Sequence, residues 1–296
     1  MSLHTVLKSS RPSFLILSPI CVFLGLSTSL ATQSQVNLFI LSLIMIGAIT
    51  AHISVNMLNE YFDFKSGLDF KTEKTAFSGG SGALPDNPEM ANIILIIGTM
   101  LLIVTTIIGA HLILERGIQI LPIGIMGVLL IVTYTQWLNR FPFLCLIAPG
   151  LGFGVLMVVG THMILTEVNS HLPWLVSLVP FFLINNLLLL NQYPDVKADA
   201  SVGRNTFPIA FGLNKSNFVY TVFLIAAYLL IVIFIAKGYL ANLSIIAVSP
   251  IILSLFALRG AYKHASEIGC FPQYLGANVA ATILTPLLLG ISIINS

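Results

Sequence analysis

Charge is what this 296-residue sequence has least of, since only 8% of its residues are Asp, Glu, Lys or Arg. A typical soluble domain carries roughly 25%. The formal net charge is only +2, so no basic surface of the size that nucleic-acid binding requires can form, and nucleic acid is excluded as a partner. Hydrophobic residues make up 57% of the chain, and its mean hydropathy is +0.98. This composition indicates an integral membrane protein.

Cysteine is scarce as well. Cys21, Cys145 and Cys270 lie far apart, in or beside apolar runs, with no CxxC or Cys/His spacing. Isolated cysteines of this kind predict packing roles and exclude a cysteine-based zinc site. The N-terminal stretch MSLHTVLKSSRP precedes an apolar run from Phe14 and lacks a small-residue cleavage site. We therefore expect a retained first membrane span and not a cleaved signal peptide.

What the sequence does contain is a series of apolar segments long enough to cross roughly 30 Å of hydrocarbon, for which a helix needs about 17 to 25 residues. They predict an all-α integral membrane protein with about nine transmembrane helices. Residues 1–296 are expected to form a single polytopic membrane domain. The predicted spans are 13–30, 37–58, 91–112, 118–137, 143–165, 172–191, 217–236, 239–258 and 274–294.

Lys and Arg are distributed unequally between the two sets of loops. With a cytoplasmic N-terminus, only Arg116 and Lys237 of the 13 basic residues lie outside. Cytoplasmic loops of membrane proteins carry an excess of basic residues, so this orientation is the predicted one. We expect a multi-pass protein of the cell inner (plasma) membrane, in which the long polar loops 59–90 and 192–216 are cytoplasmic.

Two polar stretches stand where the second and sixth spans end, NEYFDFKSGLD (59–69) and NQYPDVKAD (191–199). Polar residues four positions apart within each stretch would share one face of a helix. Oxygen ligands without a nearby His or Cys favour a hard cation such as Mg²⁺ or Ca²⁺ over zinc. Two such clusters suit a diphosphate bridged between metal ions. The candidate metal ligands are Asn59, Asp63, Asp69, Asn191, Asp195 and Asp199.

Basic residues near these stretches are candidates for contacts with phosphate. Arg204, in the sequence GRNT, and Arg140, after the fourth span, are the favoured ones, although the positive-inside bias would also place cations here. The glycine-rich run 78–82 could let backbone N–H groups approach an anion. The glycines of residues 150–160 are expected to permit close helix packing. The predicted diphosphate contacts are Lys71, Lys74, Arg140, Lys197 and Arg204.

Two other interpretations of the same residues stay open. Aspartates in loops are usually solvated surface residues, although two clusters of matching spacing on one side of the membrane argue against this. A secondary transporter would use intramembrane Asp and Asn to bind a coupling cation. Here the acidic residues lie at one membrane face and not at mid-membrane, which favours an enzyme.

Four stretches together resemble one known family. They are NEYFDFKSGLD, DVKADASVGRNTFPIAFG, the Arg11-Pro12 pair before the first span, and YTQWLNRFP between the fourth and fifth spans. This combination resembles the UbiA superfamily of intramembrane prenyltransferases over nearly the whole chain. The six-residue step from Asp63 to Asp69 resembles the MenA branch, the 1,4-dihydroxy-2-naphthoate polyprenyltransferases of menaquinone synthesis.

The resemblance implies a function and a cofactor. It implies an Mg²⁺-dependent prenyltransferase that moves a polyprenyl group from its diphosphate to an aromatic acceptor, within a UbiA-like bundle whose active site lies at the cytoplasmic helix ends. Membrane lipid would surround it, and no obligate protein partner is expected. Tyr61, Tyr134 and Phe181 are candidates for stabilising an allylic cation. The implied catalytic residues are Asp63, Asp69, Asp195 and Asp199. A UbiA-like enzyme with a non-quinone acceptor, or a terpene cyclase, is the alternative.

Overall fold

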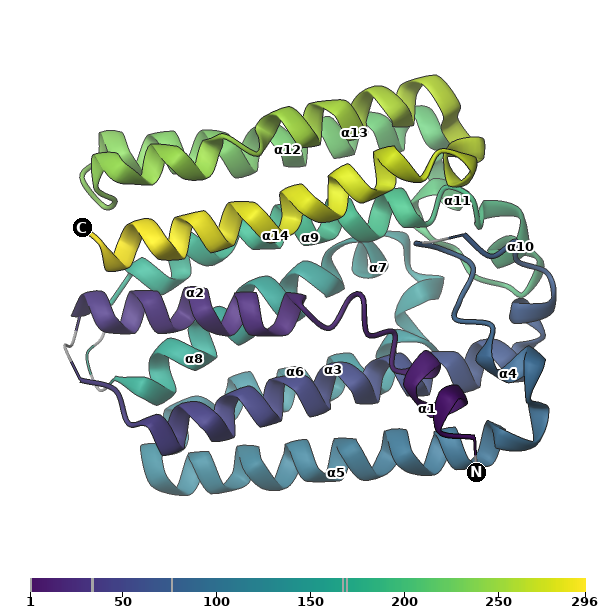
Figure 1. Cartoon of the computed structure of the whole chain (residues 1–296), viewed down its shortest axis with the longest axis horizontal. Helices are drawn as coiled ribbons and strands as arrows, with labels where there is room; N and C mark the ends of the chain where they lie inside the picture. Colours follow the sequence, from purple (N-terminus) through teal and green to yellow (C-terminus); the bar gives the residue numbers. More distant parts are fainter. Residues whose placement is uncertain (1, 33–34, 76, 167, 169) are drawn as a thin grey trace.

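The computed structural model describes residues 2–32, 35–75, 77–166, 168 and 170–296, and every regular element in them is helical (Figure 1). The all-α prediction is therefore confirmed. The α-helices are α1 (Leu3–Ser9), α2 (Leu17–Thr32), α3 (Leu38–Ser66), α4 (Ala83–Asp86), α5 (Ala91–Arg116), α6 (Leu121–Tyr134), α7 (Pro142–Pro149), α8 (Val158–Leu165), α9 (Leu172–Asn191), α10 (Val196–Ser201), α11 (Phe207–Phe211), α12 (Leu213–Ala236), α13 (Ile251–His264) and α14 (Pro272–Ile294). A π-helical segment, Gly150–Met157, joins α7 to α8, and short 3₁₀ segments cover Leu68–Phe70, Pro88–Met90, Ile118–Ile120, Leu138–Arg140, Asn242–Val248 and Ala265–Cys270.

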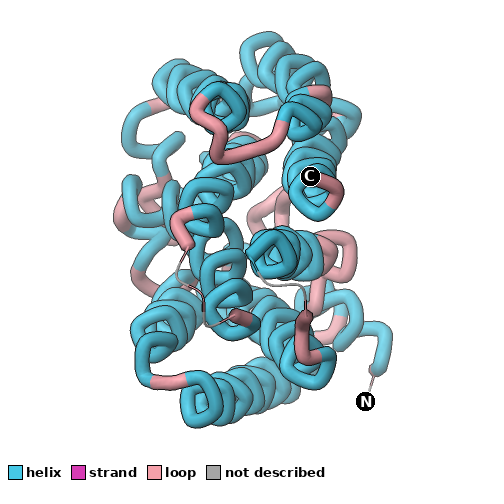
Figure 2. Tube along the Cα trace, turned by 90° about the vertical axis from the view of Figure 1, so that its left-hand side faces the viewer, coloured by secondary structure: helices cyan, strands magenta, loops and turns pink. Residues whose placement is uncertain are grey.

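The long helices lie side by side, as the end-on view in Figure 2 shows. Among the described residues, seven helical stretches are long and apolar enough to cross a membrane: Leu38–Ser66, Pro88–Arg116, Pro142–Leu165, Leu172–Asn191, Leu213–Ala236, Asn242–Cys270 and Pro272–Ile294. Two shorter apolar helices, Leu17–Thr32 and Ile118–Tyr134, stand at the first and fourth predicted spans. The nine predicted positions are therefore all helical, and seven of them have the full length of a span.

Near each polar stretch the helices differ from the sequence prediction. Helix α3 runs eight residues past the predicted end at 58, so Asn59 and Asp63 lie on the helix, and the loop begins only at Gly67. In this extension Glu60 and Asp63 are buried, whereas Lys65 and Ser66 are exposed. Helix α9 ends at Asn191, and Asp195 follows in a turn before α10. The second set of oxygens therefore does not share one continuous helix, because Pro194 interrupts it.

The eighth predicted span, 239–258, also differs from the structure. Its first part is the 3₁₀ segment Asn242–Val248, and the α-helix that follows, α13, extends to His264. Pro250 precedes the first residue of α13, and a proline is well tolerated at a helix start. The helical pattern therefore changes at this point.

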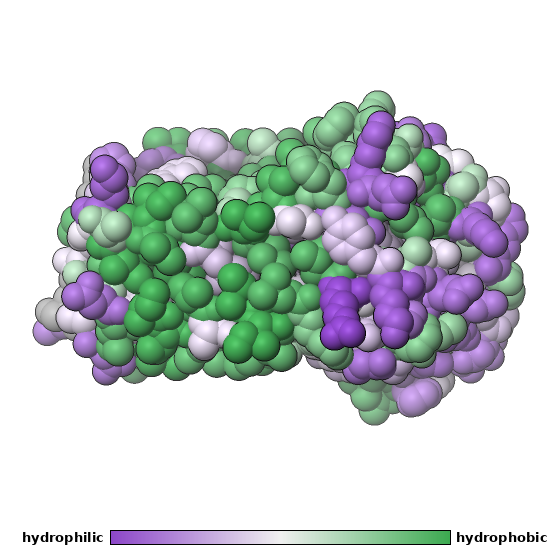
Figure 3. Space-filling view, turned by 90° about the horizontal axis from the view of Figure 1, so that it is seen from above, coloured by the Kyte–Doolittle hydropathy of each residue, from purple (hydrophilic) through white to green (hydrophobic). Residues whose placement is uncertain are grey.

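One end of the molecule is polar and the middle is apolar. In Figure 3 hydrophobic residues cover most of the middle of the visible face, and hydrophilic residues gather at the right-hand end. That is the end where α1, α4 and α10 lie in Figure 1, together with the N-terminus, while the C-terminus lies at the opposite end. This distribution is that of a multi-pass membrane protein with one enlarged polar end.

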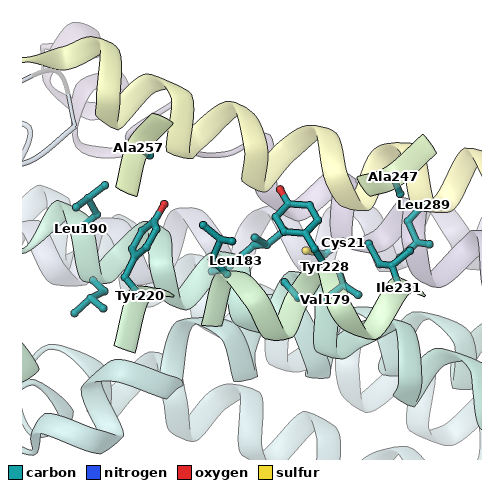
Figure 4. Close-up of a cluster of buried hydrophobic side chains, with 14 of the residues drawn as sticks. Cys21, Val179, Leu183, Leu190, Tyr220, Tyr228, Ile231, Ala247, Ala257 and Leu289 are labelled. Carbon is teal, nitrogen blue, oxygen red and sulfur yellow. The ribbon is translucent and has the colours of Figure 1, made fainter. Parts of the chain in front are cut away.

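Most residues of the largest buried cluster lie in the C-terminal half, and Figure 4 shows part of the cluster in a row along α9, α12 and α14. Polar pairs tie these helices together, as where the Tyr220 hydroxyl donates to Asn278 Oδ1 at 2.8 Å. The π-helical segment packs closely on α9, because a Cβ at Gly154 would lie 2.5 Å from the backbone N of Phe181. The predicted packing role of this glycine is confirmed. The result is a firmly packed wall beside the cavity described next.

Candidate active site

A cavity of about 1140 Å³ opens near the polar end of the bundle. Its polar end is formed by the last turns of α3, the loop after it, and the segment from α9 through α10. From there it continues between the apolar faces of α3, α5, α6 and α8. The structure brings together all six oxygen-bearing residues that the sequence singles out, since each of them lines this cavity: Asn59, Asp63, Asp69, Asn191, Asp195 and Asp199.

Arg204 joins the two acidic motifs. Its guanidinium donates one hydrogen bond to Asp63 on α3 and another to Asp199 on α10, the latter at 3.0 Å. A turn with Gly203 at φ +81° follows α10, and the Arg204 N–H then bonds back to the Asp199 carbonyl at 3.1 Å. Burial lowers the pKa of Arg204, but the two carboxylates outweigh it and hold this pKa above its usual value. Arg204 is therefore a permanent cation at the centre of the polar end.

The glycine-rich loop contacts carboxylates of both motifs. The Gly79 N–H donates to Asp195 Oδ2 at 3.0 Å, and the Ser81 N–H donates to Glu60 Oε2 at 3.3 Å. Gly80, between them, is left-handed at φ +73°, and a Cβ there would lie 2.8 Å from Asp69 Oδ1. These backbone N–H groups donate to the protein's own carboxylates, and their contact with a bound anion stays a prediction.

Sequence reasoning assigned no role to Glu60, which the structure places beside the site with no exposed surface. Its carboxylate accepts hydrogen bonds from the Ser81 hydroxyl and, at 3.3 Å, from Arg11. Arg11 lines the cavity and has a left-handed backbone at φ +52°. A carboxylate on an apolar helix requires a partner. The sequence therefore predicts that Glu60 has a partner, but it does not show which distant residue is that partner.

Crowding of carboxylates changes their acidity outside the membrane spans. Burial raises the pKa of Asp69 to about 7, and the carboxylates of Glu60 and Asp63 add to the rise. Burial likewise raises the pKa of Asp195 to about 7, together with Asp199. Burial also raises the pKa of Asp199, against the opposing effect of Arg204. These buried carboxylates are therefore harder to ionise than free aspartates, and a cation bound beside them would favour their charged forms.

The donor set fits a hard cation. Asp69 Oδ2 and Asn191 Oδ1 are buried side-chain oxygens without a hydrogen-bond partner among the described residues. Within that part of the chain, no group of three His, Cys, Asp or Glu side chains is close enough to hold a metal ion alone. Mg²⁺ usually takes one or two protein carboxylates and completes its shell with water and phosphate oxygens. The oxygen ligands are split between the two motifs, and this arrangement is compatible with Mg²⁺ ions that share a bound diphosphate.

The five predicted phosphate contacts lie in different places. Arg204 alone among them lines the main cavity. The Lys71 amine donates to Ser201 at 3.2 Å, and the Lys74 amine lies 3.8 Å from Asp86. Lys197 is exposed and lines neither cavity, and Arg140 lines a second, smaller one. Their contact with diphosphate stays a prediction, while Lys8 and Arg11 are further cations on the main cavity wall.

The apolar part of the cavity is long. Its walls extend from Ala48 on α3 to Leu112 on α5 and Ile164 on α8. Two glycines on these walls, Gly109 and Gly127, have no atom within 4 Å of the position a Cβ would take. Of the aromatic candidates, Tyr134 lines the cavity, whereas Tyr61 and Phe181 do not. The site thus combines an anion- and metal-binding end with space for an extended hydrocarbon chain.

Comparison with known proteins gives distant but extensive matches. "UbiA prenyltransferase domain-containing protein 1" of Dictyostelium discoideum is 25% identical over 263 residues, covering 83% of this chain and 76% of that protein. The "1,4-dihydroxy-2-naphthoate octaprenyltransferase" of Haemophilus influenzae is 25% identical over 273 residues, covering 90% and 86%.

Solved structures agree at the level of the fold. A UbiA homolog from Archaeoglobus fulgidus, determined with DMAPP and Mg²⁺ bound, superposes with a TM-score of 0.66 at 14% identity, and the match covers 98% of this chain and 99% of that one. The model of the UbiA prenyltransferase family matches residues 18–280, which is most of the sequence. The chain therefore belongs to the UbiA prenyltransferase family.

Proposed function

We propose that this prenyltransferase is Mg²⁺-dependent and moves a polyprenyl group from its diphosphate to an aromatic acceptor, 1,4-dihydroxy-2-naphthoate or a related quinone precursor. The observation that carries the proposal is the pair of oxygen clusters at the polar end of a long apolar cavity of about 1140 Å³. A prenyl diphosphate has the matching chemistry, a charged head and a hydrocarbon tail. The relatives named as naphthoate prenyltransferases support the acceptor class.

The diphosphate would bind at the polar end, where Arg204 and Arg11 line the cavity. Mg²⁺, when bound, would supply positive charge that neutralises the leaving diphosphate. Its proposed ligands are Asn59, Asp63 and Asp69 on one side and Asn191, Asp195 and Asp199 on the other. The buried, partnerless oxygens of Asp69 and Asn191 support this assignment.

Transfer would break the bond between the allylic carbon and the diphosphate oxygen and form a carbon–carbon bond to the acceptor ring. The ring would then lose the substituent of the attacked carbon to restore aromaticity. Tyr134 lines the cavity and could stabilise the allylic cation with its ring face. Asp69 or Asp199 could take up the proton of an acceptor hydroxyl. The apolar walls would exclude water from the cation.

The same proposal places the protein in the cell inner (plasma) membrane as a single polytopic domain, with its N-terminus and the polar end in the cytoplasm. The basis is the excess of Lys and Arg in the loops at that end. A cytoplasmic site would let a water-soluble acceptor and the charged diphosphate enter from one side while the tail remains in hydrocarbon.

The test is incubation of the purified protein in nanodiscs with labelled geranyl diphosphate and a panel of acceptors, with and without EDTA. We expect a prenylated aromatic product, its loss with EDTA, and its recovery with added Mg²⁺. Asp195→Asn should abolish product formation, whereas Asp86→Asn, on an exposed carboxylate outside the cavity, should not. Full turnover in EDTA or in Asp195→Asn would refute the metal assignment. A labelled hydrocarbon formed without any acceptor would identify a cyclase instead.

A further inference from the structure

A second cavity, of about 310 Å³, adjoins the first at the polar end. It is formed by the end of α3, the segment between α6 and α7, and the turn after α10. The two cavities share three lining residues, Asp63, Asn139 and Arg204. The volume is near the lower limit of roughly 300 to 1,000 Å³ for small-molecule sites. It is therefore large enough for a compact ring system but not for a polyprenyl chain.

The second cavity carries uncompensated positive charge. Lys65, Arg140 and Arg204 line it from three separate stretches of the chain. Asp63 is its only lining carboxylate among the described residues, and Arg204 already pairs with it. Neither Lys65 nor Arg140 forms an ion pair with another described residue. Two cations are thus available to an anionic ligand, and an arginine suits a carboxylate in particular.

Aromatic side chains complete the wall. Trp137 and Phe62 both line this cavity, and Trp137 is 59% exposed. Lys65 lies near the Tyr61 ring, with its amine 5.7 Å from the ring centroid. Aromatic walls beside paired cations match a ligand that has a flat ring and an acidic group. A diphosphate would use the cations but not the rings.

A simpler explanation is that Trp137 and Arg140 only anchor the protein at the membrane interface. The chain supplies matched residues that test this. Lys215 lies 5.7 Å from the Phe211 ring centroid, as Lys65 does from Tyr61, yet it lines neither cavity. Arg259 is an exposed arginine on α13 that also lines neither. If Lys65 and Arg140 only anchored the protein, replacing them should have the same effect as replacing Lys215 and Arg259.

We infer that the second cavity binds the aromatic acceptor by its carboxylate, with Arg140 and Lys65 holding the acid group and Trp137 holding the ring. The inference rests on the proposed function and adds to it the place where the acceptor first binds. The bound acceptor would lie beside the main cavity, separated from the prenyl chain by Asp63, Asn139 and Arg204, which line both cavities. Arg140 therefore has a different role from the diphosphate contact that the sequence suggested.

The experiment measures binding to the resting protein in nanodiscs, without prenyl diphosphate. The ligands are 1-hydroxy-2-naphthoate, 1-naphthol, which has the ring but lacks the acid, and inorganic diphosphate. We expect Arg140→Gln and Lys65→Gln each to weaken hydroxynaphthoate binding by about tenfold, the usual size for one charge-assisted contact. Binding of 1-naphthol and of diphosphate should change little, and Arg259→Gln and Lys215→Gln should bind all three ligands normally.

Three results would overturn the inference: unchanged hydroxynaphthoate binding in Arg140→Gln, an equal loss for 1-naphthol, or a selective loss of diphosphate binding. If Arg140→Gln fails to fold, Arg140→Lys keeps the charge and should lose affinity only in part. Turnover separates this inference from the proposed function. An enzyme that prenylates the naphthoate with the same acceptor KM in Arg140→Gln retains the function and refutes the site. An enzyme that prenylates no aromatic acceptor refutes the function itself.

Discussion

The guanidinium of Arg204 bonds both Asp63 and Asp199, so one side chain connects acidic motifs that are more than a hundred residues apart in sequence. Asp63 lies on α3 and Asp199 on α10, and Arg204 pairs with both carboxylates. The arginine therefore sets the separation of the motifs before any ligand binds. A diphosphate entering the cavity would meet this cation already oriented by two hydrogen bonds.

Replacing Arg204 by Gln is expected to raise the KM for prenyl diphosphate by about tenfold or more, since charge-assisted hydrogen bonds at this position are lost. It also leaves two buried carboxylates without their cation, so the protein should melt at a lower temperature. Arg204→Lys keeps the charge but cannot bond both carboxylates equally well, and it should recover part of each effect. Steady-state kinetics and thermal unfolding in detergent measure the two consequences separately.

The control for this prediction is Lys197→Gln, because Lys197 is exposed on α10 and lines neither cavity. A KM increase in this variant as large as in Arg204→Gln would mean that the whole charged surface, and not one arginine, attracts the diphosphate. A change confined to the acceptor KM in Arg204→Gln would contradict its assignment to the diphosphate.

Glu60 and Arg11 form a further ion pair beside those of Arg204, and its loss should reduce stability. Removing one partner of a buried pair costs roughly 3 to 5 kcal/mol. Arg11 is 25% exposed, so we expect about 2 to 4 kcal/mol for Glu60→Ala. The double variant Glu60→Ala/Arg11→Ala should be less destabilised than the sum of the single variants, because each single variant leaves one group unpaired. Chemical denaturation of all three in detergent would measure this coupling, and strict additivity would contradict a direct pair.

Local patterns and distant contacts differ in how far the sequence predicts them. The helices and the six oxygen residues follow from apolar run length and from spacing, which are local properties. The pairs Glu60–Arg11 and Gly79–Asp195 join residues 49 and 116 positions apart, and no local pattern specifies such partners. The predicted span ends at residue 58, before the end of α3, for a related reason. Hydropathy falls after residue 58 because the helix enters the polar end of the protein, not because it stops.

Gly80 and Gly67 form a matched pair for testing the glycine-rich loop. Both are left-handed, at φ +73° and +77°, but a Cβ at Gly80 would meet Asp69 Oδ1 at 2.8 Å, whereas one at Gly67 would meet no atom within 4 Å. Alanine should therefore cost about 1 to 2 kcal/mol of backbone strain at either position. Only Gly80→Ala should also displace the Asp69 carboxylate and raise the Mg²⁺ concentration needed for half-maximal activity. Equal Mg²⁺ requirements in the two variants would show that the close approach of Gly80 to Asp69 does not affect metal binding.

Gly127 offers a way to shorten the apolar part of the cavity without disturbing the polar end. It lines the cavity, and the space beside its Cα is open, so Gly127→Leu should place a side chain where a long prenyl tail would lie. Glycine inside a helix is unfavourable by about 1 kcal/mol relative to better helix formers, so the substitution should not destabilise α6. We expect turnover of geranyl diphosphate to persist while that of a long polyprenyl diphosphate falls by about tenfold or more, since the tail loses much of its buried apolar surface. Leu114→Phe is the control, because Leu114 is 86% exposed and lies outside the cavity, and added volume there should leave the ratio of the two activities unchanged. If Gly127→Leu leaves both activities unchanged, the prenyl tail does not pass this part of α6.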